Sequence, residues 1–367
     1  MDVLAEINAR FRYQTANLNG VQHNYIYAEP AEEAAGTVFL VHGWPDLALG
    51  WVNHIPLLLS KGFSVVALDM MGYGGTNPPR RRQILVGPQV APWEPRQNYK
   101  RLTCFFSTFK RASDDIAALA KKLDLSRIIL GGHDWGGGVV YRAAMWHPEL
   151  VAAFYCTNTP LVPPQAAHTD MAHSWSGFHY QLQLRTNTIQ DYLGPVGQQD
   201  ATRVRKLLNA IYGVTGSTGK LAIDVTGEGL DFGLLEGVNG DTPLLTKKQI
   251  DYFVESFTKN PFNNTLNWYR TSERNWEEEL PLVPGNIKYT SKLSQPALFI
   301  AATLDPTLPP VLSEGMEAYF DNLTRGEVNG GHRARWEKPD EIDSYVGNWL
   351  TSSVLGNLSL GLKPGRT

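Results

Sequence analysis

Short runs of β-branched and other apolar residues recur through the first 160 residues, and each ends near a glycine or an acidic residue. Stretches with helical spacing lie between them. The clearest is Ser113–Leu123, which has acidic residues near its start and lysines at its end, as the helix dipole favours. Strands that alternate with helices indicate a mostly parallel sheet with helices on both faces. The predicted strands are Thr37–Val41, Phe63–Leu68, Ile128–Leu130 and Ala152–Cys156.

This alternation stops near Pro160 and resumes at the apolar run Pro296–Ala301. The segment between them is rich in aromatic residues and helical in places, as in Lys247–Phe257, but offers no further parallel strand. A chain of 367 residues is long for a single domain, so an α/β domain with an inserted module is expected. We predict a core of residues 1–160 and 291–367 and a helical cap at residues 161–290.

One further segment, Pro78–Thr108, is rich in proline and has no clear helical or strand pattern. It is predicted to be a long surface loop, and loops of this length are often functional. The loop contains Arg80-Arg81-Arg82. A short run of like charges is typical of a solvated surface, and we interpret it in that way.

Composition narrows the function classes. A net charge of −3 predicts neither a nucleic-acid partner nor an anionic membrane surface. No run approaches the roughly 18 apolar residues that a membrane span needs. The N-terminal sequence lacks the basic and apolar regions of a secretion signal, so we expect a cytosolic protein. The two cysteines, Cys104 and Cys156, are predicted to be buried thiols and not a disulfide or metal site.

The strongest candidate for chemistry is the sequence Gly132-His133-Asp134-Trp135-Gly136. It joins a predicted strand to a predicted helix and matches the nucleophile-elbow pattern G-x-S-x-G, with aspartate in place of serine. A carboxylate that attacks an acyl carbon gains little, because the product is an anhydride. A carboxylate that attacks a saturated carbon with a leaving group gives a stable ester. Asp134 therefore predicts displacement at saturated carbon.

A turn with the sequence His42-Gly43-Trp44-Pro45 follows the strand that ends at Val41. Such a turn can aim a backbone N–H into the crevice where α/β sheets bind ligands. The N–H groups of Trp44 and Trp135 are predicted to form an oxyanion hole for the hydrolysis of an ester on Asp134. His42 and Pro45 are expected to line the substrate pocket.

An acid and a base follow later in the chain. Asp305 comes after the predicted strand Pro296–Ala301, and His332 follows two glycines. The order nucleophile, acid, histidine matches that of α/β hydrolases. Asp134 is already ionised at neutral pH, so His332 is predicted to deprotonate the hydrolytic water, with Asp305 as its partner. Asp321 is an alternative acid, whereas Asn158, after another strand, cannot act as a carboxylate.

The leaving group decides what else the site needs. A halide leaves without a proton, but the oxygen of an epoxide needs one. Tyrosine is a plausible acid for that oxygen, and the predicted cap contains Tyr180 and Tyr269 in aromatic-rich sequences. Most tyrosines are packing residues, so the sequence alone leaves their role open.

From about Val38 to Leu350 the chain resembles the epoxide hydrolases of the α/β-hydrolase fold, especially the soluble and fungal forms. The resemblance implies that Asp134 attacks the epoxide, that Tyr180 and Tyr269 protonate its oxygen, and that His332, held by Asp305, hydrolyses the ester. It also implies a cis peptide bond before Pro45, a small-molecule epoxide as the substrate, and no cofactor or metal. The matching motifs are His42–Pro45, Asp69–Gly74, Gly132–Gly137, Phe178–Gln181, Asn267–Trp276, Leu304–Pro306 and Gly330–Pro339.

Two alternatives remain at this point. A haloalkane dehalogenase shares the aspartate and the tryptophan after it, but holds halide with N–H donors and does not need two cap tyrosines. Trp44 argues against that branch, which commonly has asparagine at this position. A ligand-binding protein of the same fold without turnover is the other alternative, and the intact set of Asp134, Asp305 and His332 argues against it.

Overall fold

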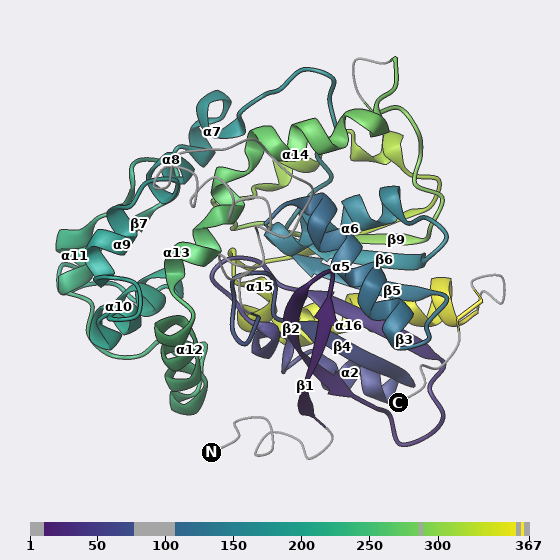
Figure 1. Cartoon of the computed structure of the whole chain (residues 1–367), viewed down its shortest axis with the longest axis horizontal. Coiled ribbons are helices and arrows are strands. Elements are labelled where there is room, and N and C mark those ends of the chain that lie inside the picture. The colour runs from purple at the N-terminus through teal and green to yellow at the C-terminus, as the bar shows by residue number, and fades with distance from the viewer. Residues whose placement is uncertain (1–10, 77–106, 286–288, 357–360, 363–367) are drawn as a thin grey trace.

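The computed structural model describes residues 11–76, 107–285, 289–356 and 361–362. An eight-stranded sheet lies at its centre, with the strand order β1-β2-β4-β3-β5-β6-β9-β10 (Figure 1). Neighbouring strands from β4 to β10 are parallel, whereas β1 and β2 are antiparallel to their neighbours. The strands are β1 (Arg12–Leu18), β2 (Val21–Ala28), β3 (Gly36–Val41), β4 (Phe63–Leu68), β5 (Ile128–His133), β6 (Val151–Thr157), β9 (Ala297–Ala302) and β10 (Leu323–Val328).

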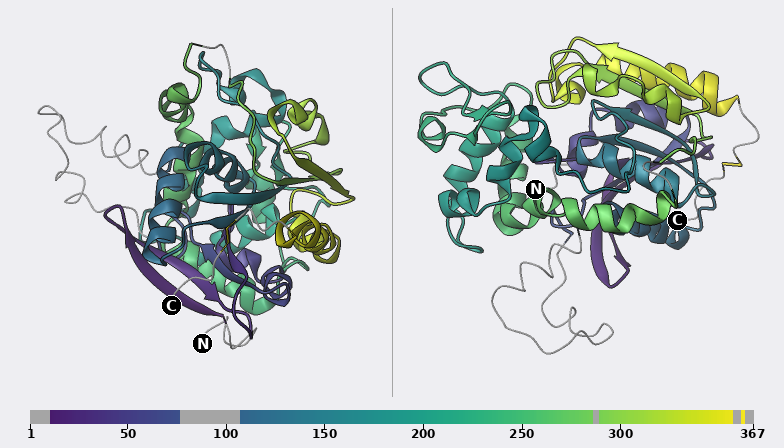
Figure 2. Two further views of the ribbon diagram at one scale, coloured as in Figure 1. Left: turned by 90° about the vertical axis from the view of Figure 1, so that its right-hand side faces the viewer. Right: turned by 90° about the horizontal axis from the view of Figure 1, so that it is seen from above.

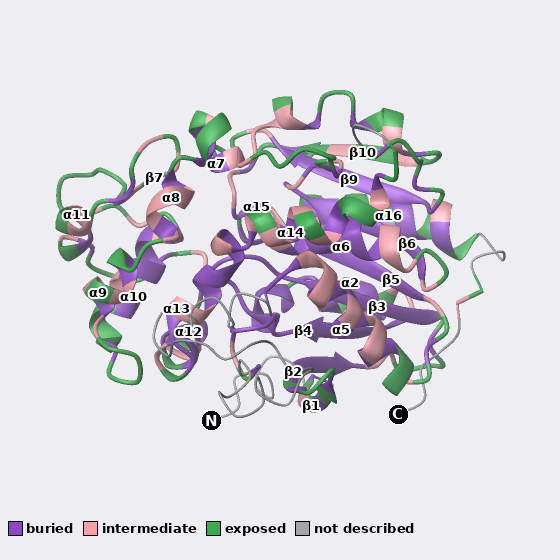
Figure 3. Ribbon diagram, turned by 45° about the horizontal axis from the view of Figure 1, so that its top comes forward, coloured by how far each residue is buried: buried purple, intermediate pink, exposed green. Residues whose placement is uncertain are grey.

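The central strands β3, β4, β5, β6 and β9 are buried along their whole length, as the purple ribbons of Figure 3 show. Parallel strands covered on both faces require such continuous apolar runs, which is why the sequence revealed them. All five predicted strands are confirmed, with shifts of their ends. The edge strands β1 and β10 escaped prediction because they carry exposed polar residues.

Helices cover both faces of the sheet, and the left view of Figure 2 separates the two layers. Helices α5 and α6 pack together on one face, and α2 and α16 pack together on the other. Helix α5 begins four residues before the predicted Ser113, because the hydroxyl of Thr108 caps it by accepting a hydrogen bond from Arg111 N–H. The core helices are α2 (Ile55–Ser60), α5 (Phe109–Lys122), α6 (Trp135–Trp146), α15 (Ala334–Glu337) and α16 (Pro339–Trp349).

The described elements between β6 and β9 take no part in the large sheet, as predicted. Most of them gather beyond one end of it, on the left of Figure 1. Helix α14 instead packs against α5 of the core, so the boundaries at residues 160 and 291 stay a prediction. These elements are α7 (Met171–Ser174), η2 (Ser176–Phe178), α8 (Tyr180–Leu184), α9 (Thr188–Leu193), α10 (Ala201–Ile211), the hairpin β7 (Ile223–Asp224) and β8 (Gly229–Leu230), α11 (Phe232–Glu236), α12 (Lys247–Lys259), α13 (Phe262–Thr265), η3 (Leu266–Arg270), α14 (Ser272–Glu279) and η4 (Leu280–Leu282).

Several sequence predictions concern single residues or short segments. Cys156 is a buried free thiol, as predicted. Cys104, the three arginines at positions 80–82 and nearly all of the Pro78–Thr108 segment lie outside the described residues. Among the helices that the structure describes, none has the length and apolar character to cross a membrane.

Candidate active site

Asp134 occupies the sharp turn between β5 and α6. Its backbone has φ 54° and ψ −129°, a positive φ that is rare for a residue with a side chain. The turn demands close backbone approaches: a Cβ added to Gly136 would lie 2.0 Å from Val41 O, and one added to Gly43 would lie 2.1 Å from Asp134 Oδ1. The predicted nucleophile elbow is therefore present, with its carboxylate projecting from the carboxyl end of the sheet.

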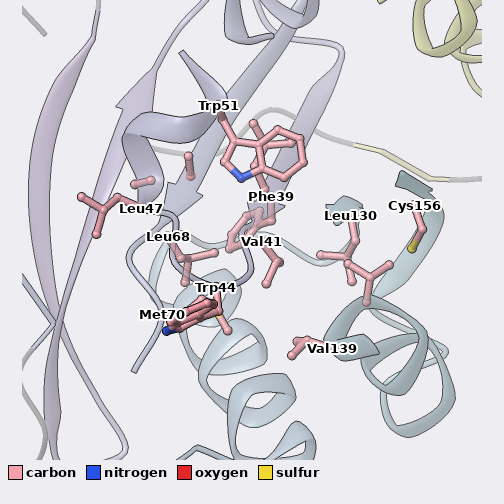
Figure 4. Packing of buried hydrophobic residues seen from close by; sticks show 14 of the residues in the cluster. Phe39, Val41, Trp44, Leu47, Trp51, Leu68, Met70, Leu130, Val139 and Cys156 are labelled. Atoms are coloured by element: carbon pink, nitrogen blue, oxygen red, sulfur yellow. The ribbon is translucent and has the colours of Figure 1, made fainter. Parts of the chain in front are cut away.

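The turn after β3 reaches this carboxylate. The backbone N–H of Trp44 donates a hydrogen bond of 2.7 Å to Asp134 Oδ1. The peptide bond between Trp44 and Pro45 is cis, as predicted. Trp44 is buried in the same hydrophobic cluster as Met70, and Figure 4 labels both side chains. Trp135, the other predicted oxyanion-hole residue, is the first residue of α6 and lines a cavity with Asp134.

His332 lies on the other side of the carboxylate. Its Nε2 is 3.5 Å from Asp134 Oδ2, and its Nδ1 is 2.8 Å from Asp305 Oδ2. The side chain of Asp305 is fully buried, and its second oxygen accepts hydrogen bonds from the backbone N–H groups of Thr307 and Leu308. The predicted nucleophile, base and acid are thus brought together in a line.

The charges of neighbouring groups shift the pKa values of His332 and Asp305. Burial disfavours the charged form of His332, but the carboxylates of Asp305 and Asp134 outweigh burial and raise the pKa of His332 to about 9. Burial likewise opposes ionisation of Asp305. The positive charge of His332, its hydrogen bond and the hydrogen bond from Asn158 nevertheless lower the pKa of Asp305 to about 2. At neutral pH the resting site therefore holds an imidazolium between two carboxylates.

Tyr180 and Tyr269 face Asp134 from the segment between β6 and β9. Tyr180 begins α8, Tyr269 lies in η3, and the centroids of the two rings are 6.4 Å apart. Both side chains are buried. Burial, reinforced by the negative charge of Asp134, raises the pKa of both hydroxyl groups well above the usual value. Both therefore carry a proton at neutral pH and can donate it.

Two cavities meet at these side chains. One of about 250 Å³ and one of about 350 Å³ share Asp134, Tyr180, Tyr269 and Thr307. The first also contains a buried ion pair, in which Arg142 Nε lies 2.8 Å from Glu279 Oε1. The second includes His332 in its wall. Asp134 and both tyrosines thus face a space that a small molecule can enter.

The structure places some candidates elsewhere. His42 and Pro45 are buried but line neither of the two cavities, contrary to the prediction. His42 Nε2 instead accepts a hydrogen bond from Met70 N–H and so stabilises the turn after β3. Asp321 is an exposed residue near Lys292 and does not reach His332. Asn158 is a residue whose positive role the sequence did not reveal: its amide donates to Asp305. Its position directly after a buried strand was the available signal.

Comparisons with known proteins identify the family of the chain. A sequence profile for the alpha/beta hydrolase fold matches residues 36–339. The chain is 31% identical to the epoxide hydrolase srdG of Neurospora crassa, over 92% of this chain and 94% of that protein. It is 28% identical to the bifunctional epoxide hydrolase 2 of Rattus norvegicus, where it spans 92% of its own length but 56% of that protein.

Solved structures give the same fold. The crystal structure of epoxide hydrolase A from Mycobacterium thermoresistibile superposes with a TM-score of 0.71 at 24% identity, covering 93% of this chain and 98% of the other. That likeness extends the agreement in fold to the cap elements outside the large sheet. With an aspartate at the elbow and relatives named for this activity, the chain belongs to the epoxide hydrolases of the α/β-hydrolase fold, enzymes that hydrolyse ether bonds.

Proposed function

We propose that this epoxide hydrolase forms vicinal diols in two half-reactions, with Asp134 as the nucleophile. In the first, a carboxylate oxygen of Asp134 attacks an epoxide carbon, and the bond from that carbon to the epoxide oxygen breaks. The freed oxygen takes a proton from Tyr180 or Tyr269. The product is an ester between Asp134 and the future diol. The observation that carries this proposal is the shared cavity wall of one carboxylate and two buried, protonated tyrosines.

In the second half-reaction His332 removes a proton from water, and the water oxygen attacks the ester carbonyl carbon. The N–H groups of Trp44 and Trp135 stabilise the negative oxygen that results. The bond to the diol oxygen then breaks, and that oxygen takes the proton from His332. Asp134 keeps one oxygen from water and passes its remaining proton to His332, which restores the imidazolium of the resting site. The contacts of His332 with Asp134 and Asp305 support this sequence.

The charge of Asp134 determines when His332 can act as a base. While Asp134 is ionised, it helps to keep His332 protonated. Formation of the ester removes that negative charge, so the pKa of His332 falls. Its proton then passes through solvent to the tyrosinate, and the neutral imidazole can act as the base for ester hydrolysis. We place the cap at residues 161–290, supported by the position of both tyrosines between β6 and β9.

The test is to trap the ester. Asp134→Ala should have no turnover and no covalent product. His332→Gln should still alkylate, so a small reactive epoxide such as styrene oxide should add its full mass to the protein at Asp134, seen by intact mass spectrometry and peptide mapping. Absence of the adduct in His332→Gln, with the epoxide consumed by the parent enzyme, contradicts the assignment. Bromide release from a bromoalkane, measured in parallel, tests the dehalogenase alternative.

A further inference from the structure

Trp44 donates hydrogen bonds from two different groups in two directions. Its backbone N–H donates to Asp134 Oδ1 at 2.7 Å, and its indole Nε1–H donates to Thr265 Oγ1 at 3.0 Å. Trp44 is 4% exposed and Thr265 is completely buried. A buried indole N–H without an acceptor is unfavourable, so the bond to Thr265 fixes the orientation of the ring. Trp44 therefore contacts Asp134 through its backbone. Through its side chain it contacts the segment that carries Tyr269.

Thr265 stands at the junction that carries Tyr269. It is the last residue of α13, and η3, which contains Tyr269, starts at the next residue. The hydroxyl proton of Thr265 is used in a 2.7 Å bond to Phe262 O, so a lone pair remains for the indole of Trp44. The start of η3 is thereby tied to the turn after β3.

The ring of Tyr269 rests edge-on against two tryptophans. Its centroid is 5.6 Å from that of Trp44, with an interplanar angle of 87°, and 5.2 Å from that of Trp135, with an angle of 83°. These two tryptophans are the ones whose backbone N–H groups are assigned to the oxyanion hole. T-shaped contacts of this kind are directional. A rotation of the Trp44 ring would therefore tilt Tyr269 and move its hydroxyl away from the epoxide oxygen.

The backbone of Trp44 is held separately from its ring. Arg333 donates to Trp44 O from both terminal nitrogens at 3.3 Å, and Asp46 N–H closes the turn onto Gly43 O at 3.1 Å. Loss of the indole bond should leave this backbone in place. The N–H that points at Asp134 should then survive, so ring opening and ester hydrolysis should respond differently.

We propose that Thr265 is a positioning residue for epoxide opening: it fixes the Trp44 ring, which holds Tyr269 at the angle needed to protonate the epoxide oxygen. This proposal rests on the acid role of Tyr269 given above. Thr265 touches no reacting atom and acts only through Trp44 and Tyr269. The pair lies 221 positions apart in the chain, so it joins the core to the segment between β6 and β9.

The test compares Thr265→Val, which keeps the shape but loses the acceptor, with Thr265→Ser, which keeps the acceptor. Stopped-flow tryptophan fluorescence with styrene oxide separates alkylation from ester hydrolysis. Thr265→Val should slow alkylation by about 10- to 100-fold, the scale of a small misplacement of a reacting group. Thr265→Ser should restore most of that rate. Ester hydrolysis should change by no more than about twofold in either variant, since a factor of two is only a few tenths of a kcal/mol at the barrier.

Thr271→Val is the matched control. Thr271 is also buried on the same segment, and among the described residues its hydroxyl donates to the carbonyls of Ser107 and Trp268 and not to a tryptophan or tyrosine ring. It should therefore leave the alkylation rate unchanged. The Tyr73 hydroxyl also interacts with Thr265, and Tyr73→Phe shows whether that interaction contributes. An equal slowing of both phases by Thr265→Val, or an equal effect of Thr271→Val, overturns the proposal.

A double variant separates failure of this proposal from failure of the mechanism. In a Tyr269→Phe background there is no hydroxyl left to position, so adding Thr265→Val should slow alkylation no further. If Tyr269→Phe alone leaves alkylation unchanged, the acid role itself is wrong. If Tyr269→Phe slows alkylation and Thr265→Val does not, only the positioning role is wrong. Should Thr265→Val fail to fold, Trp44→Phe combined with it leaves no unsatisfied indole, and its alkylation rate should equal that of Trp44→Phe.

Discussion

The side-chain amide of Asn158 donates a hydrogen bond of 2.8 Å to Oδ2 of Asp305, the oxygen that also accepts from His332. The same amide donates at 3.1 Å to the carbonyl of Gly331, one residue before His332. Asn158 has φ 66° and is almost completely buried. The side chain of Asn158 thus contacts both Asp305 and the loop that carries His332.

Replacement of Asn158 by alanine should weaken both contacts. We expect a loss of about 1–3 kcal/mol in the free energy of unfolding, because a buried carboxylate and a buried carbonyl each lose a donor. Ester hydrolysis should slow more than alkylation, since we propose that Asp305 and His332 act in the second step. Urea denaturation and two-phase kinetics measure these effects. An unchanged ratio of the two phases would show that Asn158 contributes to stability alone.

The two tyrosines should share the protonation of the epoxide oxygen. General-acid assistance is typically worth about 10²- to 10⁴-fold. Tyr180→Phe or Tyr269→Phe alone should cost part of that factor in the alkylation phase, and the double variant should cost most of it. Substrate binding should also weaken, because each variant loses a hydrogen bond to the epoxide oxygen that is typically worth about 0.5–1.5 kcal/mol. If the double variant opens epoxides at the parental rate, both tyrosines are packing residues.

The raised pKa of His332 has a consequence for stability. The folded protein holds this proton up to a pKa of about 9, above the unfolded value of about 6.5. The contribution of this proton to the free energy of unfolding is therefore complete below pH about 6.5 and is lost as the pH rises through about 9. Thermal unfolding between these limits should show a decline that His332→Gln lacks. In Asp134→Asn one of the two carboxylates is gone, and NMR titration of the imidazole should give a lower pKa.

The buried pair of Arg142 and Glu279 joins α6 to α14 through two hydrogen bonds. Removal of one partner leaves an uncompensated buried charge, so Glu279→Leu should cost about 3–5 kcal/mol of unfolding free energy. The double variant Arg142→Met with Glu279→Leu should recover much of that loss, because both charges are gone. Chemical denaturation of the parent enzyme, Arg142→Met, Glu279→Leu and the double variant measures the coupling. Additive losses would show that the pair does not interact as a unit.

Features of the fold that depend on a short local sequence pattern could be predicted from the sequence. The apolar run of β3 and the motif around Asp134 each carry their own local pattern, so the parallel sheet, the elbow and the order of Asp134, Asp305 and His332 could all be read in advance. The placement of His42 could not. Its neighbour Trp44 points to the nucleophile, but the turn directs the imidazole inward, where Nε2 accepts from Met70 N–H.

Contacts between distant residues lay beyond sequence reasoning. The hydrogen bond from Trp44 to Thr265 and the ion pair of Arg142 with Glu279 join positions 221 and 137 apart. Nothing near either residue marks its partner, because a threonine hydroxyl or a glutamate suits many environments equally well. Only the packing of the cap segment on the sheet selects these pairs.

The glycines at positions 43 and 136 leave no space for even a methyl group, since each added Cβ would overlap the Asp134 carboxylate or the carbonyl of Val41. Natural variation and laboratory evolution therefore have almost no freedom beside the nucleophile. New selectivity has to arise at a distance from it, through exchanges in the cavity walls that leave the reaction centre untouched. A library that randomises such positions should keep a high fraction of active clones; suitable targets are Val162, Met171 and Leu308 in the first cavity and Leu221, Ile223 and Leu244 in the second.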